Sequence, residues 1–301
     1  MRYPLAVLPT PLVYASRLSE VSGLEIYVKR DDLTGFGASG NKARALEYLL
    51  GAALDDGCDV LVTGGSTSSN FLPAAALAAS RAGIGCALVV SGSEDSANLE
   101  LARRAGATLH HLGPGERDRI DPAVQELADS IAGRPYAMPR GGSTPVGALG
   151  FAAAASELSA QTEAGLVVLP VGSGGSSAGL LAVPGPTRLL GVSVSRPPDE
   201  IAAKVHGLAS ECAKLLGHPE PDHSRLEIVD GRGPGFGVPG PGDLAATALA
   251  LETEGLLLDH TYTAKALAVL LERRPREPVV FWHTGGLVTA ISEYGRHHVA
   301  A

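Results

Sequence analysis

Long apolar runs, aromatic side chains and cysteines are all scarce in this chain. No apolar stretch reaches the roughly 20 residues that a membrane-spanning helix needs, so we expect no membrane partner. Hydrophobic residues make up 45% of the 301 residues, yet aromatic residues make up only 4%. The core must therefore consist mainly of Ala, Leu and Val, a composition that suits alanine-rich helices packed on Val/Leu strands.

The three cysteines lie far apart in the sequence and form no CxxC pair. Their odd number and spacing argue against a disulfide framework and against a zinc site, and they fit a reducing compartment. Cys86 lies within an apolar run, so we expect it in the core. The N-terminal segment contains three prolines and is a poor signal peptide, so we expect a soluble protein of the cytoplasm.

Basic residues are also fewer than acidic residues. The chain has 24 Lys and Arg residues against 32 Asp and Glu residues, which gives a formal net charge of −8 and a pI near 5.6. Because an acidic chain without a basic run repels phosphate backbones, we expect no nucleic-acid partner.

The chain does contain a regular alternation of apolar strands and helices. Strands are predicted at 24–29, 59–65, 85–92, 107–113, 166–171, 188–195 and 278–286, and helices at 42–54, 72–82, 98–105 and 243–254. This alternation predicts an α/β fold with parallel sheets and right-handed crossovers. Residues 219–242 are rich in Pro and Gly, so we expect a long loop there.

Three predicted strands end in Gly, Ser or Thr, in the loops 64–70, 172–179 and 283–286. Ligands bind at the carboxyl ends of strands in open parallel sheets, so these are candidate binding loops. In loop 172–179 the glycines let a ligand approach the backbone, and consecutive N–H groups before a helix favour an anion. An ordinary strand–helix turn is the alternative. The loop is not a Walker loop, and Ser177 replaces the third glycine of a dinucleotide fingerprint.

Lys42 opens a predicted helix directly after Ser39-Gly40-Asn41. The helix dipole disfavours a cation at this end, and the same field lowers the pKa of the amine. A neutral amine is a nucleophile toward an aldehyde. Taken alone, however, the residue is explained better as a surface lysine.

Seven sequence blocks together show a resemblance that runs nearly end to end. They are LPTPL (8–12), YVKRDDLTG (27–35), GNKARALEYL (40–49), GGSTPVGALGF (141–151), VGSGGSSAGL (171–180), TEGLLLDHTYTAKAL (253–267) and HTGG (283–286). In this order they resemble the pyridoxal 5′-phosphate (PLP) enzymes of the tryptophan-synthase-β fold (fold type II), within them the group of 1-aminocyclopropane-1-carboxylate (ACC) deaminase and D-cysteine desulfhydrase. The resemblance implies PLP as cofactor, a homodimer, a large PLP-binding domain of residues 1–45 and 155–301, and a small domain of residues 46–154.

The resemblance also implies roles for particular residues. Lys42 would form the Schiff base with PLP and move the substrate α-proton. Asn70 would lie beside the ring hydroxyl of PLP, Ser69 would bind the substrate carboxylate or act near the reacting carbon, and Tyr262 corresponds to an active-site tyrosine. The cofactor phosphate would be held by Gly172, Ser173, Gly174, Gly175 and Ser176.

Thr263 favours the desulfhydrase side of the group. ACC deaminases carry a glutamate at this position, which faces the pyridine nitrogen of PLP and keeps it protonated, whereas desulfhydrases carry a threonine. A hydroxyl group makes the ring a weaker electron sink, and this suits β-elimination, in which the leaving group departs promptly.

Three features depart from the pattern of the group. Loop 64–70 is one residue longer than usual and is followed by Phe71-Leu72-Pro73 in place of polar or basic residues, so carboxylate recognition should differ. Phe236 stands where a tyrosine is usual, which removes an acid/base or orienting group and disfavours ring opening of ACC. Arg140 is unusual, and it either contacts a second substrate carboxylate or lies on the surface.

We therefore expect a PLP-dependent lyase that eliminates a Cβ leaving group from a small amino acid, such as D-cysteine, and gives a keto acid and ammonia. ACC ring opening, β-replacement and non-catalytic binding of a phosphorylated small molecule are the alternatives. His283 either lines the site or belongs to the core. His110 and His111 point to opposite sides of a predicted strand, so no metal site is expected there.

Overall fold

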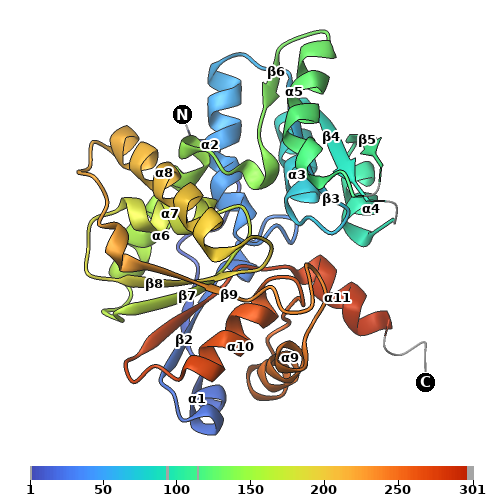
Figure 1. Cartoon of the computed structure of the whole chain (residues 1–301). Coiled ribbons are helices and arrows are strands. Elements are labelled where there is room, and N and C mark those ends of the chain that lie inside the picture. Colours follow the sequence, from blue (N-terminus) through green and yellow to red (C-terminus); the bar gives the residue numbers. More distant parts are fainter. Residues whose placement is uncertain (1, 93–94, 114, 297–301) are drawn as a thin grey trace.

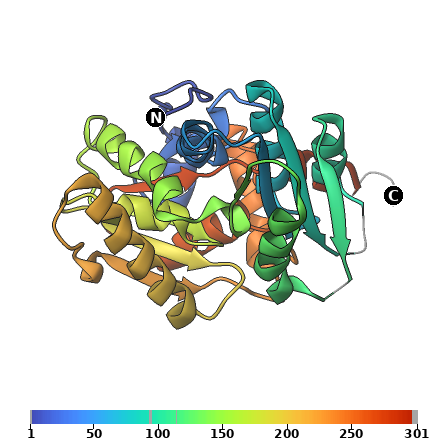
Figure 2. The ribbon, with the colours of Figure 1, turned by 90° about the horizontal axis from the view of Figure 1, so that it is seen from above.

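Two separate β-sheets organise the chain, and Figures 1 and 2 show them side by side. The structure is a computed structural model, and it describes residues 2–92, 95–113 and 115–296. The larger sheet has the strand order β1-β2-β10-β7-β8-β9, and the smaller sheet has the order β5-β4-β3-β6. All pairings are parallel except that of β1 with β2. This agrees with the predicted α/β class.

The elements alternate along the chain much as expected. The strands are β1 (Leu12–Tyr14), β2 (Ile26–Arg30), β3 (Val60–Ser66), β4 (Gly85–Ser91), β5 (Thr108–Leu112), β6 (Pro135–Ala137), β7 (Leu166–Val171), β8 (Arg188–Ser193), β9 (Leu226–Asp230) and β10 (Val279–His283). The helices are α1 (Ser16–Ser22), α2 (Lys42–Asp55), α3 (Phe71–Ala82), α4 (Ala97–Arg104), α5 (Ile120–Ser130), α6 (Pro145–Ser159), α7 (Gly175–Ala182), α8 (Pro198–Leu216), α9 (Pro241–Glu254), α10 (Thr263–Arg273) and α11 (Leu287–Arg296).

The larger sheet is buried on both faces. Along β7, Val167, Leu169 and Val171 belong to the core formed with α6, α7 and α8, whereas Leu166 and Val168 belong to the core formed with α1, α9 and α10. Figure 1 shows these two groups of helices on opposite sides of the sheet. A strand covered on both faces must be apolar throughout, which explains the continuous run in β7.

The smaller sheet is also covered on both faces. Val62 and Val89 pack with α5, whereas Leu61, Leu88 and Val90 pack with α2, α3 and α4. The helix α2 in turn lies directly against α6, because a Cβ atom added at Gly150 would stand only 2.2 Å from the carbonyl oxygen of Arg44. The helix that begins at the candidate lysine therefore connects the cores of the two sheets.

One expectation for this part of the chain is wrong. The stretch 219–242 is not a continuous loop, since it contains β9, which pairs in parallel with β8 at the edge of the larger sheet. Leu226, Ile228 and Val229 are only partly buried at this edge. The surrounding Pro and Gly residues indicated a loop, and a strand of five residues was too short to change that prediction. The predicted domain limit at 154/155 falls inside α6, and the division into domains stays a prediction.

Among the residues that the structure describes, no helix combines the length and apolar character needed to cross a bilayer. In the same part of the chain, no group of three or more His, Cys, Asp or Glu side chains could hold a metal ion. All three cysteines are free, and Cys86 is buried, as expected.

Candidate active site

A cavity that is partly open to solvent collects the three candidate binding loops around Lys42. Its lining includes Gly65, Ser66, Ser69 and Asn70 from the first loop, residues 172–177 from the second, Thr284 and Gly286 from the third, and Tyr262. Of the predicted site residues, only Thr263 does not line this cavity.

The backbone around Lys42 is fixed by two neighbouring segments. Gly40 has a φ of +57°, and a Cβ atom there would lie 2.4 Å from the carbonyl oxygen of Thr284, so only glycine fits without movement. Asn41 N donates to that same oxygen at 2.9 Å, and Thr34 Oγ1 donates to the Gly40 carbonyl at 2.9 Å. The loop after β10 therefore determines where α2, and with it Lys42, begins.

The environment of Lys42 favours the neutral amine. Burial lowers the pKa of Lys42 to about 8, although the nearby carboxylate of Asp259 opposes this change. Asp259 is itself buried, and burial raises the pKa of its carboxyl against hydrogen bonds from Thr263, Tyr262 and Thr261. A lysine in this state can attack an aldehyde at neutral pH.

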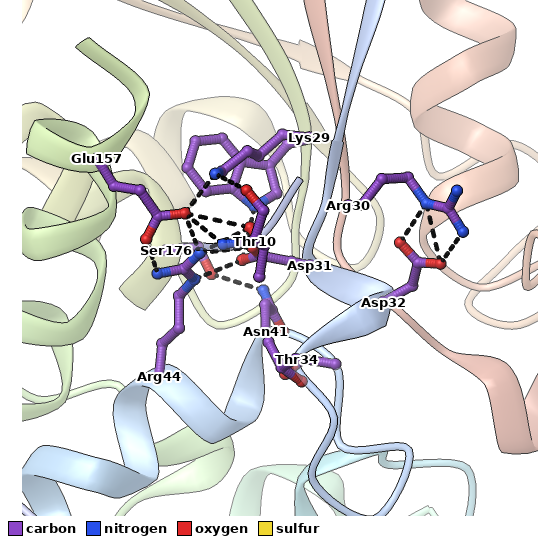
Figure 3. Close-up of polar contacts among 12 residues, drawn as sticks. Thr10, Lys29, Arg30, Asp31, Asp32, Thr34, Asn41, Arg44, Glu157 and Ser176 are labelled. Carbon is purple, nitrogen blue, oxygen red and sulfur yellow. Dashed lines mark hydrogen bonds and ion pairs between the residues drawn. The ribbon is translucent and has the colours of Figure 1, made fainter. Parts of the chain in front are cut away.

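The loop between β7 and α7 has features that suit an anion. Gly174 adopts a φ of +95°, α7 starts at the next residue, and residues 172–177 line the cavity, so the start of α7, whose first N–H groups lack partners within the helix, lies at the cavity wall. Ser143 Oγ donates to Ser173 Oγ at 2.6 Å. Asn41 Nδ2 donates to Ser176 Oγ at 3.0 Å, a contact visible in Figure 3. The lysine loop and the anion-binding loop are thus joined directly.

Ser69 and Asn70 lie at the start of α3, in the loop after β3. Asn70 Oδ1 accepts hydrogen bonds from Asn98 Nδ2 at 3.2 Å and from Thr289 Oγ1 at 3.0 Å. Asn98 belongs to α4 and Thr289 to α11, so these bonds fix the loop from two sides. Ser69 Oγ accepts from the backbone N–H of Phe71 at 3.3 Å and lines the cavity.

An aromatic pair closes another side of the cavity. Tyr262 and Phe236 meet edge to face with ring centroids 6.0 Å apart. A Cβ atom at Gly172 would stand 3.0 Å from Tyr262 Cε1, which places the tyrosine beside the anion-binding loop. Burial, aided by Asp259 and opposed by Arg117, raises the pKa of Tyr262 to about 12. Tyr262 therefore carries its proton at neutral pH.

Thr263 is fully buried behind this surface. Its Oγ1 donates to Asp259 Oδ1 at 2.7 Å and accepts from the Asp259 backbone N–H at 2.9 Å. The expected relation of Thr263 to the pyridine nitrogen stays a prediction. Asp259, whose carboxylate accepts from the backbone N–H groups of the turn 261–263 that leads into α10, was missed from the sequence.

A buried ion network, shown in Figure 3, supports the helix of Lys42. Arg44 Nε and Nη2 donate to the two oxygens of Asp31 at 2.9 and 2.8 Å. Arg44 Nη1 donates to Glu157 Oε2 at 3.0 Å, and Lys29 forms an ion pair with the same carboxylate. Trp282 Nε1 donates to Asp31 Oδ2 at 2.8 Å. The block YVKRDDLTG therefore has a structural role, because it ties α2 to β2, β10 and α6.

The remaining candidate residues differ in whether they line the cavity. Arg140 lines the cavity and pairs with Asp121 through Nε at 2.9 Å. His283 is buried, does not line the cavity and accepts from Gly285 N, so it is a core histidine. Arg117 and Lys204 also line the cavity, and the sequence offered no local signal for either.

These groups fit a cofactor that carries both an aldehyde and a phosphate. Lys42 supplies an amine of lowered pKa, and the loop 172–177 supplies N–H and hydroxyl donors on another wall of the same cavity. Together with two mainly parallel sheets, this arrangement defines the class of PLP-dependent enzymes.

Comparisons with known proteins agree. Residues 3–285 match the family described as pyridoxal-phosphate dependent enzyme. The chain is 36% identical to a D-cysteine desulfhydrase of Klebsiella pneumoniae over 322 residues, which cover 98% of this chain and 97% of the relative. It is 38% identical to a D-cysteine desulfhydrase of Yersinia enterocolitica, with 92% and 91% covered.

The solved structures point the same way. A crystal structure described as that of an ACC deaminase homologue has a TM-score of 0.92 and 32% identity, with 99% of this chain and 95% of that chain covered. Threonine deaminase isoform 2 from Solanum lycopersicum, at 18% identity and a TM-score of 0.70, shares the fold. The chain belongs to the family of pyridoxal-phosphate dependent enzymes. It is an enzyme of this family, and PLP is its cofactor.

Proposed function

We propose that this protein is a lyase that removes the α-proton and a Cβ leaving group from a small amino acid, and so releases a keto acid and ammonia. The observation that carries the proposal is that Lys42 and the loop 172–177 line one cavity. Relatives of nearly full length named D-cysteine desulfhydrase support the reaction class.

PLP, when bound, supplies an electron sink that makes the α-proton of an attached amino acid acidic. Lys42 would hold the cofactor, and its amine, once free, would take the α-proton of the substrate. The lowered pKa of Lys42, about 8, leaves a useful fraction of that amine neutral at physiological pH.

The other residues bind and orient. Residues 172–176 would hold the cofactor phosphate, and Asn70, which Asn98 and Thr289 fix in place, would contact the cofactor ring hydroxyl. Ser69 binds the substrate carboxylate. Tyr262, protonated at neutral pH, donates a hydrogen bond toward the reacting groups.

The proposal extends to organisation and assembly. Each sheet has its own core clusters, which supports a division into two domains, and we place the large one at residues 1–45 with 155–301 and the small one at 46–154. At the limit itself, Ala148 and Ala152 pack in the core of the larger sheet. We further propose a homodimer that works in the cytoplasm. Sedimentation equilibrium of the purified holoenzyme tests the dimer, and a mass equal to one chain of 30.7 kDa would contradict it.

The first experiment is an absorbance spectrum of the purified protein with PLP, followed by addition of D-cysteine, L-cysteine, D-serine and ACC. Wild-type protein should show the visible band of lysine-bound PLP, and D-cysteine should perturb this band and release sulfide, ammonia and pyruvate. Lys42→Ala should lack the band. Lys214→Ala, whose side chain is 65% exposed, is the matched control and should behave as wild type.

Two outcomes would redirect the assignment. Turnover of ACC alone would move it to ring opening, which the absence of a hydroxyl at Phe236 disfavours. Tight binding of phosphorylated compounds without any turnover would identify a binding protein.

A further inference from the structure

The cavity is strongly cationic although the chain as a whole is acidic. Its described lining contains five basic side chains and no Asp or Glu: Lys42, Arg117, Arg140, Arg196 and Lys204. The whole chain carries a net charge of −8. Focused positive charge of this kind favours an anionic ligand.

Two of these cations have carboxylate partners close by. Arg140 pairs with Asp121, and Arg196 Nη1 lies 3.3 Å from Glu200 Oε1 on α8. Among the residues that the structure describes, neither Arg117 nor Lys204 forms an ion pair. Burial lowers the pKa of both, and the repulsion of Arg196 and Arg140 acts in the same direction. Tyr262 and Asp118 oppose this change at Arg117, and Asp121 and Glu200 oppose it at Lys204, but none of these groups forms an ion pair with either cation.

Arg117 is held in place by two contacts. Its carbonyl oxygen accepts from Arg140 Nη1 at 2.9 Å. Its guanidinium stacks over the ring of Phe236 with Cζ 4.2 Å from the ring centroid. A stacked guanidinium keeps its N–H edge available for an oxyanion, which it binds in a bidentate manner. The guanidinium of Arg117 therefore lies at the aromatic pair of Phe236 and Tyr262.

The two unpaired cations come from different halves of the chain. Arg117 precedes α5 of the smaller sheet, and Lys204 lies on α8 of the larger sheet (Figure 1). Beside them, Ser195 Oγ lines the cavity and is buried without a hydrogen-bond partner among the described residues. A buried hydroxyl of this kind calls for a ligand atom.

We propose that Arg117 and Lys204 bind a second anionic group on the substrate side chain, so that the enzyme selects amino acids with an anion beyond Cβ. This deepens the proposed function and rests on it. The α-carboxylate is assigned to Ser69, and the cofactor phosphate to the loop 172–177, so the second anion is an additional determinant of specificity.

O-Phosphoserine illustrates the chemistry. Lys42 takes the Cα proton, the Cβ–O bond breaks, and phosphate leaves with the electron pair of that bond. One water is consumed, and the products are pyruvate, ammonia and inorganic phosphate. No oxidant or reductant is required.

The test compares O-phosphoserine with β-chloroalanine, each as the D and the L form, on the holoenzyme. The wild type should favour O-phosphoserine in kcat/KM. Arg117→Met should lower the ratio of the two kcat/KM values by about tenfold to a hundredfold, since hydrogen bonds to charged groups have this strength. Lys204→Met should lower it in the same direction. Arg119→Met, an exposed neighbour paired with Glu116, is the control and should leave the ratio unchanged.

A binding measurement tests the second-anion site independently of the elimination reaction. Calorimetry with 2-amino-3-phosphonopropionate, which cannot lose its phosphonate, should give tighter binding than alanine, and Arg117→Met should remove that advantage. If neither amino acid is eliminated, the proposed reaction fails, while this binding result still decides the second-anion site. An unchanged ratio together with weaker PLP binding in Arg117→Met and Lys204→Met would assign the cations to the cofactor phosphate and overturn the inference.

Discussion

The apoprotein should capture PLP with a pH dependence determined by the burial of Lys42. An ordinary lysine, with a pKa of 10.5, is neutral in about one molecule in three thousand at pH 7. With a pKa of about 8, Lys42 is neutral in about one molecule in ten, roughly a 300-fold gain. Capture should accelerate about tenfold per pH unit below 8 and level off above it. Asp259→Asn removes the carboxylate that opposes the shift, so its profile should move to lower pH.

The assay follows the visible band after apoprotein is mixed with PLP between pH 6 and 10. Lys42→Ala gives the background, and a small free amine corrects for the ionisation of PLP itself. Folding of Asp259→Asn is checked by circular dichroism, because its side chain also accepts N–H bonds from Thr261 and Tyr262.

Two results would refute this reasoning. A wild-type profile that rises through pH 10 without levelling off would mean that water solvates the ammonium group of Lys42. A shift of the Asp259→Asn profile toward higher pH would mean that Asp259 does not stabilise that charge.

Three further predictions concern the structure around Lys42. Arg44→Met leaves the buried carboxylate of Asp31 without its ionic partner and the partly buried carboxylate of Glu157 with Lys29 alone. It should reduce the free energy of unfolding in urea by about 3–5 kcal/mol, whereas Arg104→Met, at an exposed site, should change it by less than about 0.5 kcal/mol. Burial alone would raise the pKa of Glu157, but hydrogen bonds from Arg44 and Lys29 outweigh it and lower the pKa. The ionised Glu157 therefore stabilises the fold fully at pH values above its ordinary pKa of 4.5, and this contribution is lost as the pH falls through the lowered pKa of the folded state. The difference in unfolding free energy between the wild type and Glu157→Gln should therefore shrink in acid. A difference that stays constant with pH would contradict this. Gly40→Ala should weaken PLP binding at least about tenfold. In thermal unfolding it should destabilise the fold by more than the roughly 1–2 kcal/mol that a left-handed conformation costs an alanine. The control Gly83→Ala, which has a similar φ but open space around its Cβ, should lose only that roughly 1–2 kcal/mol.

Local patterns were enough to predict seven of the ten described strands but only four of the eleven described α-helices. The helix expected at 42–54 is Lys42–Asp55, and the strand expected at 166–171 is Leu166–Val171. Both have strong periodicity or a continuous apolar run, and both are bounded by Gly or polar residues. The edge strand β9 was missed because an edge strand is only half buried and its apolar pattern is weak.

The candidate site was predictable where a motif carries its own mechanism. The glycine-rich loop 172–179 indicates anion binding through backbone geometry alone, and the ordered sequence blocks pointed to Lys42. The environment of that lysine was not predictable, because Asp259 reaches it only through the tertiary fold. The stacking of Arg117 on Phe236 likewise joins segments that no local pattern relates.

The bond between Asn41 and Ser176 has a consequence for how such an enzyme can change. It couples the loop that precedes Lys42 to the loop 172–177, so a mutation that disturbs one of these loops should also disturb the other. Arg117, Arg140 and Phe236 lie outside that coupled pair. Substitutions there can retune which amino acid is accepted while the inherited chemistry stays intact, and new specificities should therefore arise at these positions first.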